Sequence, residues 1–325
     1  MKKTILLIAC LALTASAASA KGPLASDTDA SSYIKQVDAA YRHYDNAITL
    51  HALPAPSPLD WTSLATLARG MARNTVMVKY GKESHGMGHV SFEIRCASGG
   101  QRYSIVTGQD SNKSMGLFAQ RAKAGHGYEL FYDTVPGRLQ AQKDIDREYA
   151  ALSKYPNEIA YATFLVSPQS CMQAMHFMKD YIADGVYTRY GLGVSPFKGE
   201  GGGCANVGVA VLKAAGLSDY DRVSPQWGKT IYLPVEMQAK PGQKIKPVKF
   251  LKYLNYHWAR KDAAVPSTPL DFYDPELVYN WIVKSFTAKA APVDGRPVSR
   301  YAINKSRGIV VDYTTDSGLP VSWWK

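Results

Sequence analysis

The feature that most constrains the fold is a glycine run that delivers one cysteine to the start of an apolar segment, within residues 199–217. Gly201–Gly203 precede Cys204, and the apolar residues that follow predict a helix ending near Gly216. The first N–H groups of a helix have no internal partners and stabilise a thiolate, which lowers the pKa of a cysteine there below about 8.5. Two interpretations stay open from this stretch alone: an activated nucleophile, or a small buried cysteine after a glycine turn.

Residues 1–20 predict a signal peptide. Lys2 and Lys3 form a basic start, an apolar run follows, and Ala18-Ser19-Ala20 has the small-residue pattern of a cleavage site. The apolar run is too short to span a bilayer, so we expect a mature chain without a transmembrane segment. A lipoprotein anchored at Cys10 is the less favoured alternative, because a better cleavage site follows it. We therefore expect an exported protein, periplasmic or extracellular.

Cysteine usage leaves one thiol unpaired. After removal of the signal, Cys96, Cys171 and Cys204 remain, an odd number in an oxidising compartment. One economical arrangement is a Cys96–Cys171 disulfide with Cys204 free. The alternative is three free buried thiols, which suits Cys171 because it shares a helical face with Met175 and Met178.

The rest of the chain divides into three segments. Residues 21–74 predict an N-terminal helical segment, residues 75–220 a catalytic core, and residues 221–325, which prolines interrupt, a C-terminal wrapping extension. The predicted fold class is α+β, with a small antiparallel sheet or half-barrel packed against the cysteine-bearing helix.

Hydrophobic periodicity and β-branched runs locate the expected elements. Strands are expected at residues 75–80, 89–95, 102–107, 128–132 and 159–166. Helices are expected at residues 34–48, 61–71, 139–152, 167–184 and 274–286.

The formal charge of +11 at pH 7 indicates attraction to anionic surfaces such as the cell envelope. The densest basic patch is interrupted by two prolines and predicts a solvated face, so we expect no specific nucleic-acid binding. Its members are Lys240, Lys244, Lys246, Lys249, Lys252, Arg260 and Lys261.

His89 is the candidate partner of Cys204. Alternation along its strand places Val90 and Phe92 on the core face, and His89 with Ser91 on the other. A helix N-terminus packed across that other face would let the imidazole act as general base for the thiol and as acid for the leaving group. The alternative is a surface histidine or a satisfied core histidine.

A cysteine–histidine pair needs a third polar group that orients the imidazole. The strand after His89 offers Gln101, Ser104, Thr107 and Gln109, and the residues themselves do not select among them. Backbone N–H groups of Cys204 and of Gly203 or Gly202 are the expected donors to an oxyanion.

The segments Gly88-His89-Val90-Ser91-Phe92 and, more than a hundred residues later, Gly203-Cys204-Ala205-Asn206-Val207 resemble the circularly permuted NlpC/P60 branch of papain-like cysteine hydrolases. The resemblance covers residues 75–217 at most, and Tyr190-Gly191-Leu192 fits it loosely. It implies Cys204 as nucleophile and His89 as base. In unpermuted relatives the third residue follows the histidine by about a dozen positions, which implies Gln101. Family members are peptidases, amidases and acyltransferases that use a thiolate–imidazole pair beside a small antiparallel sheet.

Other chemistries have less support. His85 and His89 have the spacing of a helical metal pair, but the two glycines between them disfavour a helix, so we expect no metal and no cofactor. No Gly-x-Ser-x-Gly elbow supports a serine triad.

The predicted function is therefore thiol-dependent hydrolysis or acyl transfer on an amide- or ester-containing substrate, such as a peptidoglycan peptide at an anionic envelope surface. The alternative is a non-catalytic envelope-binding protein on a degenerate papain-like fold, which the 21 tyrosines and the basic charge favour.

Overall fold

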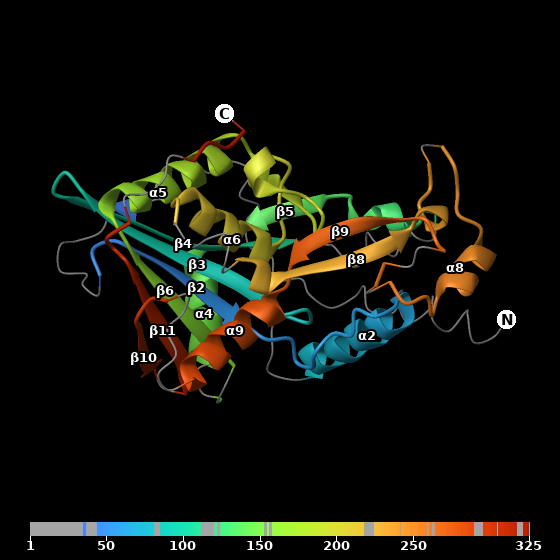
Figure 1. Cartoon of the computed structure of the whole chain (residues 1–325), viewed down its shortest axis with the longest axis horizontal. Coiled ribbons are helices and arrows are strands. Elements are labelled where there is room, and N and C mark those ends of the chain that lie inside the picture. Colours follow the sequence, from blue (N-terminus) through green and yellow to red (C-terminus); the bar gives the residue numbers. More distant parts are fainter. Residues whose placement is uncertain are drawn as a thin grey trace.

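A nine-stranded mixed sheet forms the main body, and a two-stranded sheet projects from it (Figure 1). The fold class is α+β, as predicted, but the sheet is large and mixed, which corrects the expected small antiparallel sheet or half-barrel. No helix of the described chain is long and apolar enough to cross a membrane. The structure, a computed structural model, describes residues 35–36, 44–80, 85–111, 120–121, 124–152, 155, 158–217, 224–240, 242–258, 260–261, 264–288, 295–303, 305–316 and 321–324.

The strands of the large sheet follow the order β10-β11-β6-β2-β3-β4-β5-β7, and β1 pairs with β4. Their bounds are β1 (Lys35–Gln36), β2 (Ala47–Leu53), β3 (His89–Ser98), β4 (Gln101–Ser111), β5 (Val135–Leu139), β6 (Ala160–Val166), β7 (Arg189–Tyr190), β10 (Val298–Ile303) and β11 (Ser306–Tyr313). Most neighbours are antiparallel, but β11 runs parallel to β6. The C-terminal hairpin is thus part of the main sheet, and residues 221–325 do more than wrap around it.

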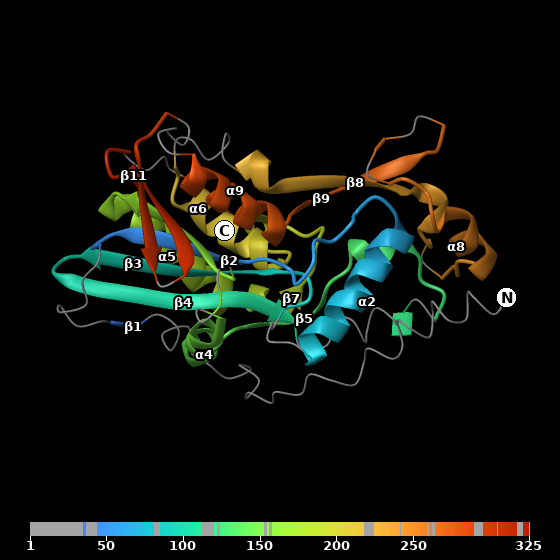
Figure 2. The ribbon, with the colours of Figure 1, turned by 90° about the horizontal axis from the view of Figure 1, so that it is seen from below.

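Three helices cover the apolar face of this sheet: α5 (Pro168–Ala183), α6 (Cys204–Ala214) and α9 (Pro275–Thr287). Helix α4 (Gln142–Leu152) lies on the other side, as Figure 2 shows against α6 and α9. Val90 and Phe92 of β3 are fully buried in the apolar core, as alternation predicts. Gly208 lets α6 approach them closely, because a Cβ there would lie 3.0 Å from Val90 Cγ1.

The projecting part has its own apolar cluster. It combines β8 (Gly228–Pro234), β9 (Ser267–Tyr273), α2 (Leu64–Tyr80) and α8 (Pro247–Tyr253). Trp258 is buried there, and its Nε1 donates a hydrogen bond to the Trp61 carbonyl at 2.6 Å. Trp61 and Trp258, which are 197 positions apart in the sequence, therefore share this second core.

Several sequence predictions of secondary structure are wrong. Residues 75–80 continue α2, and residues 128–131 form a 3-10 turn (Tyr128–Phe131). The helix expected over residues 34–48 is contradicted by β1 near its start and by β2 at its end; residues 34 and 37–43 lie outside the described part. The seven residues of β2 are all buried, because the strand has a neighbour on each side and is covered on both faces. Ile48, Leu50 and Ala52 alternate with Thr49 and His51, so the sequence has the period of two of a strand, and the helical spacing inferred up to Ile48 was the wrong interpretation.

The predicted Cys96–Cys171 disulfide is present and joins β3 to α5. It closes a loop across 75 positions, and Cys204 is the free cysteine of the described residues. The disulfide is consistent with export.

Replacing Cys96 and Cys171 together with alanine is expected to lower the free energy of unfolding by about 2–5 kcal/mol, because the unfolded chain is no longer cross-linked. Urea denaturation of the oxidised protein would measure the loss. The control is Cys204→Ala, which leaves the cross-link intact. Equal stabilities of the double variant and the control would contradict the prediction.

Candidate active site

Four polar side chains meet where β3 begins. His89 is the first residue of β3, Cys204 is the first residue of α6, Gln140 directly follows β5, and Tyr190 ends β7. The first two are nearly excluded from water, with 3% of His89 and 6% of Cys204 exposed. Electrostatic interactions between them are therefore weakly screened.

The surroundings of Cys204 favour a thiolate. Burial raises the pKa of the thiol, but the charge of His89 and a hydrogen bond with its ring lower it. The backbone N–H groups of Val90 and Ala205 lower it further, and the net pKa lies below the ordinary value. The N–H of Ala205 belongs to the first turn of α6, where orphan donors are expected. Cys204 and His89 thus form a pair that can carry opposite charges.

The route by which the two residues meet differs from the expectation. Helix α6 packs on the apolar face of the sheet, where Gly208 contacts Val90, and not across the face that holds His89. The pair forms because both residues open their elements at the same end of β3. A position at the end of a strand brings a side chain of the opposite face within reach of the helix N-terminus.

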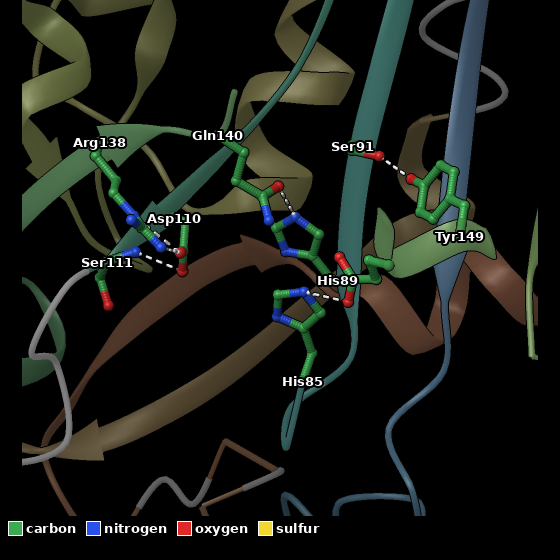
Figure 3. Close-up of polar contacts among 9 residues, drawn as sticks. His85, His89, Ser91, Asp110, Ser111, Arg138, Gln140 and Tyr149 are labelled. Atoms are coloured by element: carbon green, nitrogen blue, oxygen red, sulfur yellow. Dashed lines mark hydrogen bonds and ion pairs between the residues drawn. The ribbon is translucent and has the colours of Figure 1, made fainter. Parts of the chain in front are cut away.

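Gln140 orients the imidazole. Its Oε1 lies 2.7 Å from His89 Nε2 (Figure 3). Since a carbonyl oxygen can only accept, Nε2 carries a proton and Nδ1 is the nitrogen left for the thiol. The backbone of Gln140 is fixed to β4, because its N–H donates to the Gly108 carbonyl at 2.9 Å and its carbonyl accepts from Thr107 Oγ1 at 2.9 Å.

Gln101, the residue that the family resemblance implies, does not reach His89. It is the exposed first residue of β4, pairs with Ser98 at the hairpin turn, and accepts a hydrogen bond from Tyr103. The ten-residue length of β3 separates it from His89. The long hairpin therefore overturns an assignment that rests on spacing.

The other strand options lie elsewhere too. Ser104 pairs with Arg95 in mid-sheet, and Gln109 turns to the other face, where its Nε2 donates to the Tyr187 carbonyl at 2.6 Å. Only Thr107 supports the site, through the backbone of Gln140.

The glycine run Gly201–Gly203 allows the backbone before Cys204 to pack closely against neighbouring residues. The Gly202 N–H donates to the Arg189 carbonyl at 3.1 Å, so it is not available to an oxyanion and its predicted role is wrong. Gly201 has φ 113, a conformation that favours glycine, and a Cβ there would lie 2.4 Å from the Arg189 carbonyl oxygen. Gly203 is the N-cap of α6 in an extended conformation, and a Cβ on it would lie 3.2 Å from the Gly191 carbonyl oxygen. The run thus seats Cys204 against β7.

Tyr190 occupies the space in front of the α6 N-terminus. Its hydroxyl accepts the N–H of Cys204 and also hydrogen-bonds the thiol. Burial, followed by the charges of Cys204 and Asp110, raises its pKa well above the ordinary value, so the phenol stays protonated. It is thus a neutral hydroxyl beside the reactive sulfur.

A half-buried ion pair borders the imidazole. Asp110 of β4 accepts hydrogen bonds from Arg138 Nη2 at 2.8 Å and from the Ser111 N–H at 2.7 Å (Figure 3). Burial raises the pKa of Asp110, but the charge of His89 and the Arg138 hydrogen bond outweigh it, and the net pKa is lowered. Asp110 is therefore an ionised carboxylate near His89.

Sequence reasoning missed Gln140, Asp110 and the hydroxyl role of Tyr190. Gln140 follows a five-residue strand that contains Pro136 and Gly137, and no strand was predicted there. Only the pairing of β4 with β5 brings it to His89. A polar residue directly after a short strand was the one available signal.

No protein-family model, curated protein or solved structure matches this chain. The likeness to the NlpC/P60 branch therefore rests on the short motifs alone, and the functional argument rests on the geometry of the site. Among the described residues, no group of three or more His, Cys, Asp and Glu side chains is arranged to hold a metal ion.

Proposed function

We propose that the protein is an exported thiol-dependent hydrolase or acyltransferase that acts on an amide or ester, with Cys204 as nucleophile. One observation carries the proposal: the Cys204 thiol hydrogen-bonds an imidazole whose other nitrogen is held by Gln140 at 2.7 Å. A nucleophile, a base and an orienting group in series are the arrangement that acyl transfer requires.

The proposed reaction has two halves. His89 takes the thiol proton, and the Cys204 sulfur attacks the carbonyl carbon to form a tetrahedral intermediate. The intermediate collapses to a thioester as His89 returns the proton to the departing amine or alcohol. Water, or an acceptor amine or hydroxyl, then attacks the thioester, with His89 as base, and regenerates the thiol.

Two donors are in place for the developing oxyanion. The Cys204 N–H and the Tyr190 hydroxyl are mutually hydrogen-bonded in the free protein. A carbonyl oxygen that enters between them could accept from both, because the hydroxyl can rotate to donate. We therefore assign this role to Cys204, as the sequence analysis expects, and to Tyr190 in place of Gly202, whose N–H is bonded to Arg189.

The same proposal extends to the fold and the substrate. Histidine precedes cysteine in the chain, and β3, β4 and β5 pair antiparallel; both features support the proposed relation to the NlpC/P60 branch. Export and positive charge support an envelope substrate such as a peptidoglycan stem peptide.

Alkylation of the native, non-reduced protein tests the proposal. Iodoacetamide is expected to label Cys204 alone, since Cys96 and Cys171 are paired, and the rate is expected to reach half its maximum below pH 8.5. Peptide mapping by mass spectrometry identifies the site, and Cys204→Ala is the control. Turnover of peptidoglycan fragments and of a generic thioester is then compared for both proteins. A Cys204 that labels only after denaturation would reject the nucleophile and favour the non-catalytic, envelope-binding alternative.

A further inference from the structure

A second imidazole lies against the proposed base. The rings of His85 and His89 have centroids 4.1 Å apart and planes 9° from parallel, and Figure 3 shows one ring over the other. The sequence spacing that suggests a helical metal pair thus forms a tight turn. The Gly88 N–H donates to the His85 carbonyl at 3.3 Å, and Gly88 has φ 76, which favours glycine.

This stacked ring is held from two sides. The Asn74 side-chain amide of α2 donates to the Gly86 carbonyl at 2.8 Å, which fixes the turn. From α4, Glu148 Oε1 lies 2.9 Å from His85 Nε2. The side chains of His85 and Glu148 are only 19% and 11% exposed, so the contact is largely shielded from water. The ring cannot swing away from His89 without losing this carboxylate.

We propose that His85 is a positioning residue for His89, which supports the Cys204–His89 ion pair while neutral and opposes it when protonated. The inference rests on the function proposed above. A neutral ring stacked on His89 holds its orientation and offers a π face to the imidazolium. A protonated ring at the same distance places a like charge against it.

The charged groups around His85 determine how protonation of His85 changes the Cys204–His89 ion pair. They are His89 on β3, Asp110 on β4 with its partner Arg138 on β5, and Glu148 on α4. Glu148 is the carboxylate in direct contact with His85. When His85 takes a proton from solvent, the proton on His89 moves to the Cys204 sulfur, and the reactive thiolate is lost. The site therefore takes up one proton and becomes inactive as the pH falls.

The test is the pH dependence of Cys204 alkylation in the full-length mature protein. In His85→Phe, which keeps a stacking ring but cannot be charged, the acid limb is expected to move to lower pH by about one unit, the scale on which a neighbouring charge moves a pKa. Glu148→Gln is expected to move it in the same direction, because His85 then holds its proton less tightly. His176→Phe, at an exposed position on α5, is the matched control and keeps the wild-type profile.

The outcomes separate the two proposals. A Cys204 that is inert in the native wild-type protein overturns both. A reactive wild-type Cys204 whose acid limb is unchanged in His85→Phe and in Glu148→Gln overturns the role of His85 alone. Because Glu148→Gln leaves the stacked pair intact, it decides the matter even where His85→Phe fails to fold.

Discussion

Replacing His89 with asparagine is expected to slow turnover by about 10²–10⁴-fold, the range that a positioned general base contributes. The substitution is also expected to raise the pKa of the Cys204 thiol. Burial raises the pKa of Cys204, and the charge and hydrogen bond of His89 lower it. Removal of the imidazole therefore removes the main interaction that lowers this pKa and leaves the effect of burial. The thiol pKa should then exceed its ordinary value of about 8.5. Alkylation of Cys204 at pH 7 is expected to fall at least about tenfold.

A second histidine provides the control for this prediction. His126 has a side chain that is 47% exposed, and its Nδ1 lies 3.4 Å from Glu129 Oε1, a residue of the 3-10 turn Tyr128–Phe131. His126→Gln should leave both alkylation and turnover at wild-type rates. Wild-type reactivity of Cys204 in His89→Asn would show that the thiolate does not depend on the imidazole, and would remove His89 from the mechanism.

The elements that carry the site could largely be predicted from sequence. The helix after Cys204 has an apolar pattern and a preceding glycine run, and the strand after His89 alternates cleanly, so local signals and tertiary structure agree there. The count of cysteines in an exported chain gave the disulfide as one of two alternatives, and the structure contains it. These predictions depend on short-range pattern or on counting, which a single sequence contains.

The predictions that are wrong concern pairing between strands that lie far apart in the sequence. Strand β2 lies between β3 and β6 in the sheet, a position that no local pattern indicates. Strand β11 joins the sheet only through its parallel pairing with β6, well over a hundred residues away. Gln140 was missed and Gln101 chosen for the same reason, because register between strands decides which polar side chain faces His89.

Gly108 has a role in the site that the sequence alone does not indicate. A Cβ at Gly108 would lie 2.5 Å from Gln140 Oε1 and 2.9 Å from His89 Nε2, and 3.0 Å from Ser91 Cβ. The two nearest atoms are the ends of side chains, so they can move aside without breaking the strand. That movement would break the hydrogen bond that orients the imidazole.

Gly108→Ala is therefore expected to lower the alkylation rate of Cys204 at pH 7 and the rate of turnover by about 10²-fold, the cost of a misplacement on the order of 1 Å in an active site. The melting temperature should fall much less than a core truncation would lower it. Gly228→Ala is the matched control, because the nearest atom to a Cβ there, the Pro225 carbonyl oxygen, is 3.5 Å away. Full reactivity of Cys204 in folded Gly108→Ala would mean that the bond between Gln140 and His89 does not position the base. Loss of activity that only parallels unfolding would assign Gly108 to stability instead.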